Sequence, residues 1–259
     1  MRDVDLRSLP LYVAGEISMA VRIHGMSERL ERDTSWAAHA HPTHELLWNE
    51  RGASTATIDS RVWTITPMIG LWIPAGVVHQ GRASAATWYR TAHFSAGGDT
   101  AVPTIAAEPV AVDMSPLLRL LLDRLANDPL PEQLRLLTEQ MVLDVIEPSE
   151  SPLSVAAPTG DLLRPIAAAV LADPSDRRTL GDWSQAVGAS PRTITRAFMA
   201  ETGTGFSRWQ GAVRAHRAVI LLSEGTDLES GAESVGYGSV SAFGAAFRRA
   251  TGRTPSDFR

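Results

Sequence analysis

One unit of this chain is present in two similar copies, and the first copy reads Thr179-Leu-Gly-Asp-Trp-Ser-Gln-Ala-Val-Gly-Ala-Ser-Pro-Arg-Thr-Ile-Thr-Arg-Ala-Phe-Met-Ala-Glu-Thr-Gly203. The second copy reads Val235-Gly236-Tyr237-Gly238-Ser239 and continues to Ala246-Phe247-Arg248-Arg249-Ala250-Thr251-Gly252. The shared Val-Gly pairs are 48 residues apart, whereas the shared Ser, Ala-Phe and Thr-Gly are 49 apart, so one residue is added between them. An insertion confined to a turn is what a repeated helix-turn-helix tolerates.

Local start and stop signals predict two helices in the first copy. Thr179 is suited to cap a helix with Asp182 three residues later, and Gly188 suits its end, where a positive φ is needed. Ser190 is suited to cap the next helix, because Pro191 then takes the first position, where no backbone N–H is missed. The two helices are joined by about four residues, so they must cross sharply.

The second predicted helix has one apolar and one polar face. Helical spacing puts Ile194, Ala197 and Phe198 on one side. The other side carries Arg192, Thr195, Arg196 and Met199. Arginine and threonine donors suit guanine edges and phosphates in a major groove. A solvated helix face has the same composition, but the duplication of the unit favours DNA binding.

Residues 179–259 resemble the DNA-binding domain of the AraC/XylS family of transcription regulators. Besides the tandem units, the matching features are a connecting helix over 207–222 and the end of the chain. These carry Arg214, Ala218, Leu221, Leu222, Phe247, Gly252, Pro255, Phe258 and Arg259. The resemblance implies sequence-specific binding to double-stranded DNA.

The second recognition helix departs from the first. Its equivalent positions are Ser241, Gly244, Ala245 and Arg248, which offer few groups that read bases. We therefore expect base specificity from the first unit, and phosphate contacts from Arg248, Arg249 and Arg253. Ser190 and Ser239, at the starts of the two recognition helices, complete the expected DNA-contacting set.

Composition bounds the remaining possibilities. The length of 259 residues and a 44% hydrophobic content predict two domains. We find no stretch of roughly 20 apolar residues, no signal-peptide core and no cysteine, so we expect a cytoplasmic protein without disulfides or contact with membranes. All Lys-or-Arg positions are Arg. Residues 1–160 contain 12 Arg and 19 acidic residues, and residues 161–259 contain 12 Arg and 10 acidic residues. The mildly basic second part favours binding to specific sites over general adhesion to DNA.

Residues 1 to about 110 have the pattern of short strands separated by turn residues. The apolar runs are 19–23, 55–58, 62–65 and 87–94. Their spacing predicts a small barrel or sandwich. The whole chain is therefore predicted to be an α+β protein of several domains.

Two motifs in this region resemble those of the cupin barrel, which AraC-type regulators often carry as a sensor. They are His39-x-His41-x3-Glu45 and Gly70-Leu-Trp-Ile-Pro-Ala-Gly-Val-Val-His79. If 39–49 is largely extended, His39, His41 and Glu45 point to one side and His44 to the other. His79 would join them from a neighbouring strand.

Three imidazoles and a carboxylate are predicted to hold a divalent metal such as zinc, nickel, manganese or iron. The alternative is that these four side chains line a pocket for an organic ligand. The sequence leaves both open.

Helical periodicity begins after the barrel. We divide the chain into a barrel over 1–112, a helical hairpin over 113–147, a linker over 148–160 and a DNA-binding domain over 161–259, opened by a helix that Asp161 caps. The second hairpin helix carries an apolar stripe of Leu134, Leu137, Met141 and Val145. The stripe either packs on the barrel or, as the family resemblance implies, pairs two subunits in a homodimer.

Together these features predict a transcription regulator that senses a small molecule or a divalent metal. The alternative is a metal-dependent cupin enzyme that uses His39, His41, Glu45 and His79, with an accessory helical domain. The tandem helix-turn-helix has no role in small-molecule chemistry, and no general acid or base stands out beyond the ligand set. We therefore expect a regulator and not an enzyme.

Overall fold

The computed structural model describes residues 4–150 and 153–259. The chain forms two compact units. Of the described residues, the first contains 4–59 and 63–150, and the second contains 60–62 and 153–259. The first unit is mostly β structure and the second mostly helical, so the predicted α+β fold class is confirmed.

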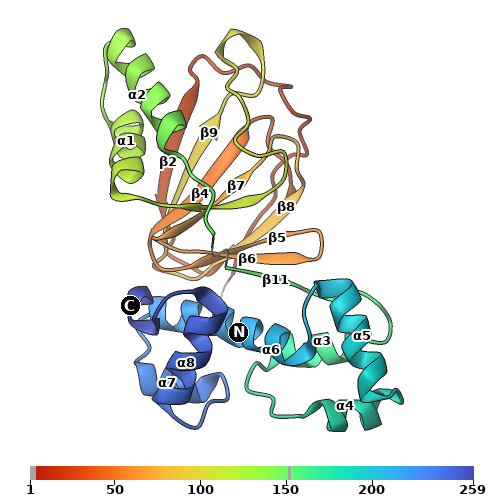
Figure 1. Ribbon diagram of the computed structural model, residues 1–259. Coiled ribbons are helices and arrows are strands. Elements are labelled where there is room, and N and C mark those ends of the chain that lie inside the picture. The colour runs from red at the N-terminus through yellow and green to blue at the C-terminus, as the bar shows by residue number, and fades with distance from the viewer. Residues whose placement is uncertain (1–3, 151–152) are drawn as a thin grey trace. The chain divides into compact units, whose positions relative to one another are not determined.

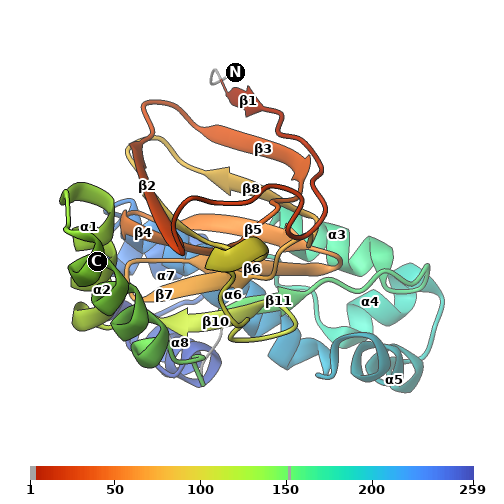
Figure 2. The same cartoon turned by 90° about the horizontal axis from the view of Figure 1, so that it is seen from above.

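The described strands form two sheets. One has the order β1-β3-β8-β5-β6-β11, and its strands are β1 (Asp5–Arg7), β3 (Thr34–His39), β8 (His79–Ala83), β5 (Ser54–Ile58), β6 (Arg61–Ile65) and β11 (Ser154–Ala156). The other has the order β10-β7-β4-β9-β2, and its strands are β10 (Val110–Asp113), β7 (Ile69–Ile73), β4 (His44–Arg51), β9 (Trp88–Phe94) and β2 (Ile23–Arg29). Figure 2 shows the strands of the first unit from above.

Burial explains why some strands are easy to predict and one is not. The central strand β7 is buried at every position, as its continuous apolar sequence requires. Strand β2 lies at a sheet edge and is mostly exposed, so its polar sequence gives no apolar signal. The strand predicted over 19–23 is therefore wrong, because β2 begins only at Ile23.

Two helices, α1 (Pro116–Asn127) and α2 (Glu132–Val145), form the predicted hairpin beside β2 (Figures 1 and 2). Leu118 and Leu122 of α1 and Val142 of α2 are fully buried in the core of this unit. Glu139 of α2 accepts a hydrogen bond from the backbone N–H of Ile23, and Arg135 donates to the carbonyl of the same residue. Both backbone groups at the start of β2 are thus satisfied by side chains of α2.

The helices of the second unit are α3 (Arg164–Ala172), α4 (Leu180–Val187), α5 (Pro191–Thr202), α6 (Phe206–Ser223), α7 (Leu228–Ser234) and α8 (Val240–Thr251). The long helix α6 lies between the α4–α5 pair and the α7–α8 pair (Figures 1 and 2). The predicted capping box of Thr179 and Asp182 is confirmed, as is the cap at Ser190. Gly188 has φ +66°, so it takes the left-handed conformation that the end of α4 requires.

One expectation near the start of this unit is wrong. Asp161 does not cap a helix, because α3 begins at Arg164 after Leu163, and the Asp161 carboxylate instead accepts a hydrogen bond from Arg164. The range expected to be a linker contains strand β11, in which Val155 is buried. Residues 151 and 152 of that range lie outside the described residues. A Val between two small residues is too short a pattern to predict a strand.

Among the described residues, none of the helices is both long and apolar enough to cross a bilayer.

The interaction of Glu139 with Ile23 predicts a stability effect. The change Glu139→Ala removes the buried acceptor, so the N–H of Ile23 loses its hydrogen bond and the guanidinium of Arg135 loses its ion pair. We expect the free energy of unfolding to fall by about 1–3 kcal/mol, measured by chemical denaturation. As a control, Gln140→Ala on the exposed side of α2 removes only a surface hydrogen bond to Asp144 and should change stability by less than about 0.5 kcal/mol. Equal effects of the two changes would contradict this interpretation.

Candidate functional site

Three histidines of the first unit meet within the barrel. One ring nitrogen from each of His39, His41 and His79 lies within 4.8 Å of the others, which is close enough for a single metal ion. His39 ends β3 and His79 begins β8, and the two residues are paired across the strands after a register shift. Their ring centroids are 4.2 Å apart. The predicted convergence of the three imidazoles is therefore present.

The route by which they converge differs from the expectation of one extended segment over 39–49. Strand β3 ends at His39 and β4 begins at His44, and the two strands belong to different sheets. Pro42 lies in the break, where a residue without an N–H does not interrupt a ladder of hydrogen bonds. The chain thus crosses from one sheet to the other, and His41 lies in this crossing.

The turn before His79 is held against the same crossing. Gly76 has φ +77°, and its N–H donates to the carbonyl of His41 at 2.9 Å. A side chain at residue 76 would be strained by that φ and would meet the backbone N of Ala14 at 3.2 Å. The glycine therefore lets the 74–78 turn approach His41 closely.

Hydrogen bonds to the backbone fix the orientation of two of the rings. Nδ1 of His39 lies 2.7 Å from the carbonyl oxygen of Ala37, and Nδ1 of His79 lies 3.0 Å from that of Val77. Because a carbonyl only accepts, both Nδ1 atoms carry the proton. Nε2 of each neutral ring then keeps its lone pair, which is the arrangement typical of histidine ligands to metals.

Glu45 lies beside the three rings and is 2% exposed. Its Oε2 atom is 3.4 Å from Nε2 of His79 and 3.7 Å from Nε2 of His41, yet Oε2 forms no hydrogen bond with a described residue. Burial raises the pKa of Glu45, but contact with His79 and the charges of His93 and His41 outweigh burial and lower the pKa to about 2. A buried, charged oxygen without a donor fits a metal ligand.

The imidazoles differ in their affinity for protons. Burial lowers the pKa of His41 to about 4 and also lowers the pKa of His39, so both rings are neutral at neutral pH. Burial acts to lower the pKa of His79 as well, but contact with Glu45 and the charge of its carboxylate raise that pKa above the usual value. His39 and His41 are thus ready to donate lone pairs, and His79 is the ring whose pKa the neighbouring Glu45 raises.

His93 is a member of this cluster that the sequence did not reveal. It lies on β9 directly opposite Glu45 of β4, and its ring centroid is 5.0 Å from that of His41. Nδ1 of His93 is 3.0 Å from the hydroxyl oxygen of Thr43, and burial lowers the pKa of the ring. A histidine inside an apolar run was the available signal, but its pairing with Glu45 depends on a register that the sequence does not give.

His44 is directed elsewhere, as predicted. Its Nδ1 accepts a hydrogen bond from the backbone N–H of Ala75, and its ring stacks on Trp72 at a centroid distance of 5.2 Å. Burial lowers the pKa of His44, so the ring is neutral and free to accept that bond. His44 therefore supports the 74–78 turn from outside the cluster.

The second unit presents the predicted polar face on its first recognition helix, α5. Arg192, Thr195, Arg196 and Met199 are all exposed, whereas Ile194 and Phe198 are fully buried. The hydroxyl of Thr195 donates to the carbonyl of Pro191, so only its lone pairs remain for a ligand. The two arginines are therefore the main donors of this face.

The second recognition helix, α8, exposes fewer donors. Ser241, Ala245 and Arg248 are exposed, and Gly244 is half-buried. Ser239 caps α8 by accepting from the N–H of Ala242, as Ser190 does for α5. The cap accounts for both serines structurally, and their contact with DNA stays a prediction, as do the contacts of Arg248, Arg249 and Arg253.

Two family models match the chain. One, described as an AraC-like ligand binding domain, matches residues 24–157, and the other, described as a helix-turn-helix domain, matches residues 183–259.

Individual proteins are also similar. The HTH-type transcriptional regulator NimR of Escherichia coli is 24% identical over 247 residues, covering 94% of this chain and 88% of that protein. The HTH-type transcriptional regulator RipA of Corynebacterium glutamicum is 37% identical over 95 residues, covering 37% of this chain and 29% of that protein. Among solved structures, ToxT of Vibrio cholerae is 12% identical with a TM-score of 0.37, covering 93% of this chain and 98% of that one.

Proposed function

The chain belongs to the AraC family of helix-turn-helix transcription regulators, and we propose that the effector bound by its barrel is a divalent metal ion. Members of this family bind DNA and regulate transcription, so the chain is a regulator and not an enzyme. The observation that carries the proposal is the charged, buried Oε2 of Glu45, which has no hydrogen bond and faces two imidazoles.

The ligand set of this proposal is His39, His41, His79 and Glu45. Three neutral imidazoles and one carboxylate suit a borderline ion such as zinc, nickel, manganese or iron. His93 supports the set from β9, because it is paired with Glu45 and its ring centroid lies 5.0 Å from that of His41. When bound, the metal would place a positive charge next to the buried carboxylate.

Metal content tests this proposal. Full-length protein, purified and then incubated with zinc, nickel, manganese or iron, should hold about one ion per chain by elemental analysis. His41→Ala removes one ligand and should lose the ion. His44→Ala is the matched control, because His44 bonds to Ala75 and lies outside the cluster, so this variant should keep it. Wild-type protein that takes up none of the four metals would leave the cluster as the lining of an organic-ligand pocket.

DNA recognition is proposed to be unequal between the two helix-turn-helix units. Arg192 and Arg196 of α5 are free donors on an exposed face, which supports base contacts in a major groove. On α8 the exposed face offers Ser241, Ala245 and Arg248, which supports contacts to phosphate and to thymine methyl groups.

Binding-site selection with two variants tests this division. Arg196→Ala should cost about 1–3 kcal/mol on the preferred site and relax the preference at one base position. Arg248→Ala should weaken binding to all sequences alike and reduce the salt slope by about 1. The two changes each remove one exposed arginine, so each is the control for the other. An unchanged base preference in Arg196→Ala would contradict the assignment.

We also propose that α2 pairs two copies of the chain. Leu134, Leu137 and Met141 lie on one face of this helix and are 44%, 57% and 47% exposed. An exposed apolar stripe of this kind is typical of an interface. Two linked DNA-binding units gain affinity when both occupy their sites at once.

Sedimentation of the full-length chain without DNA tests the pairing. At micromolar concentration the wild type should sediment as a dimer, and Leu137→Glu should yield a monomer because a charge on the stripe cannot be buried without a partner. Gln140→Glu adds the same charge to an exposed position outside the stripe and should remain dimeric. A monomeric wild type would remove the proposal.

A further inference from the structure

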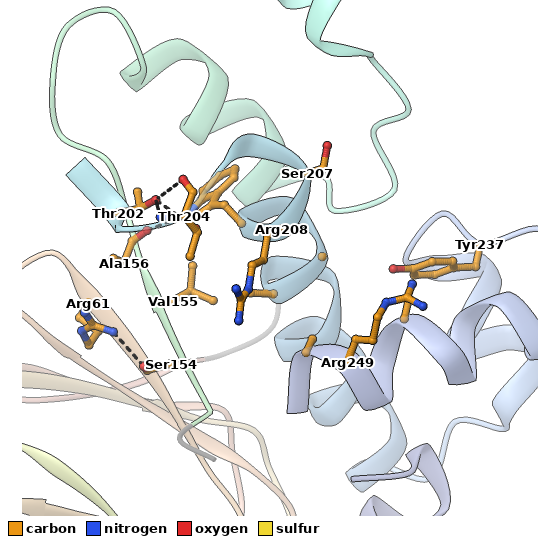
Figure 3. A pocket seen from close by; sticks show the side chains of 15 residues that line it. Arg61, Ser154, Val155, Ala156, Thr202, Thr204, Ser207, Arg208, Tyr237 and Arg249 are labelled. Carbon is orange, nitrogen blue, oxygen red and sulfur yellow. Dashed lines mark hydrogen bonds between the residues drawn. The ribbon is translucent and has the colours of Figure 1, made fainter. Parts of the chain in front are cut away.

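A cavity of about 660 Å³ lies in the second unit, beside α6 and α8 (Figure 3). Its volume falls in the range that holds small-molecule ligands, roughly 300–1,000 Å³. Every residue that lines it belongs to the second unit, and none is Asp or Glu. The charged lining residues are Arg61, Arg208 and Arg249. The cavity is therefore positively charged.

Two of these arginines are available to a ligand. Arg208 and Arg249 are exposed, and neither has an acidic partner in the part of the chain that the structure describes. Arg164 and Arg178 of the same unit are by contrast paired with Asp161 and Asp176. A guanidinium without a partner has its full set of donors free for a phosphate or carboxylate.

The remaining lining adds hydroxyl groups and an apolar wall. The hydroxyls come from Ser154, Thr202, Thr204, Ser207 and Tyr237. The apolar wall includes Val155, Ala212 and Ala246 and the edge of Trp209, whose indole N–H is held by the carbonyl of Ala156. Such a wall suits the carbon skeleton of a ligand, and the hydroxyls suit its oxygens.

The start of α6 also favours negative charge in the cavity. Arg208 lies in the first turn of α6, where no side chain caps the free N–H groups, so the positive end of the helix dipole adds to the field. Tyr237 also lines the cavity. The centroid of its ring lies 5.4 Å from Cζ of Arg214 and 5.7 Å from the ring centroid of Phe243. In Figure 3 the side chain of Arg249 extends toward that ring.

Arg249 does not share the exposed face of its neighbour Arg248. One residue turns an α-helix by about 100°, so Arg248 falls with Ser241 and Ala245, whereas Arg249 falls beside Ala246. Of these residues, only Arg249 and Ala246 line the cavity. The phosphate contact expected for Arg249 is thus less well supported than that for Arg248.

We propose that this cavity binds a small organic anion, a phosphate or carboxylate with an apolar body, through Arg208 and Arg249. The ligand bridges the first turn of α6 and the recognition helix α8, and so links the connecting helix to the second helix-turn-helix. This site is separate from the barrel and does not depend on the proposed metal.

Calorimetric titration of the full-length protein tests the site with phenyl phosphate, phenylacetate, inorganic phosphate and benzyl alcohol. At least one of the two aromatic anions should bind about tenfold more tightly than either inorganic phosphate or benzyl alcohol, because only these anions use both the arginines and the apolar wall. The double variant Arg208→Gln, Arg249→Gln should weaken that binding at least about tenfold. Arg217→Gln removes an exposed charge from the same helix α6 but does not line the cavity, so it should bind as the wild type does.

Three results would overturn the proposal. The first is no detectable binding of either aromatic anion to the wild type, and the second is equal binding by the double variant. The third identifies DNA as the occupant: the double variant loses affinity for every duplex, and the aromatic anions neither bind the wild type nor compete with DNA. None of these readouts requires metal in the barrel, so failure here is distinct from failure of the metal proposal.

Discussion

A carboxylate buried inside a small barrel is costly unless positive charge or strong donors face it, and the cluster around Glu45 is arranged around that constraint. Two cross-strand pairs supply the environment: His39 with His79 on one sheet, and Glu45 with His93 on the other. His41 joins them from the crossing between the sheets. Because Glu45 stays ionised with one oxygen unbonded, the hydrogen bonds of the barrel alone do not satisfy it. The proposed cation, shared by the carboxylate and the imidazoles, would satisfy all these groups together.

Local patterns in the sequence predicted what local interactions determine. The caps at Thr179 and Ser190 and the left-handed Gly188 depend only on residues a few positions away, and all three are confirmed. The three clustered histidines were identified from the two cupin-like motifs, although the extended segment assumed over 39–49 is interrupted after His39. Features that depend on pairing between residues far apart in the sequence were not predicted. The edge strand β2 has no apolar pattern of its own, and His93 reaches the cluster only through its register with β4.

Side chains can also take the place of a neighbouring strand as hydrogen-bond partners of backbone N–H and C=O groups. The periodicity of a sequence does not predict such contacts. At the start of β2, Glu139 and Arg135 bind the N–H and the carbonyl of Ile23 from a helix more than a hundred residues later in the chain. This pairing buries the polar side chains of α2 against the barrel and leaves Leu134, Leu137 and Met141 outside. The apolar stripe therefore does not serve to attach its own helix, and this favours a role in contact with another copy.

The two helix-turn-helix copies separate the requirements of folding from those of recognition. The residues that the copies share have the same structural task in each: Phe198 and Phe247 are buried, Gly203 and Gly252 have φ near +70°, and Ser190 and Ser239 cap their helices. On the outward faces of the two recognition helices the positions that differ are exposed or half-buried, and there Arg192 and Arg196 are replaced by Ser241 and Ala245. Packing therefore explains the repeat but not the differences. Because an exposed arginine contributes little to stability, the donors found only on α5 are best explained by what that helix contacts in DNA.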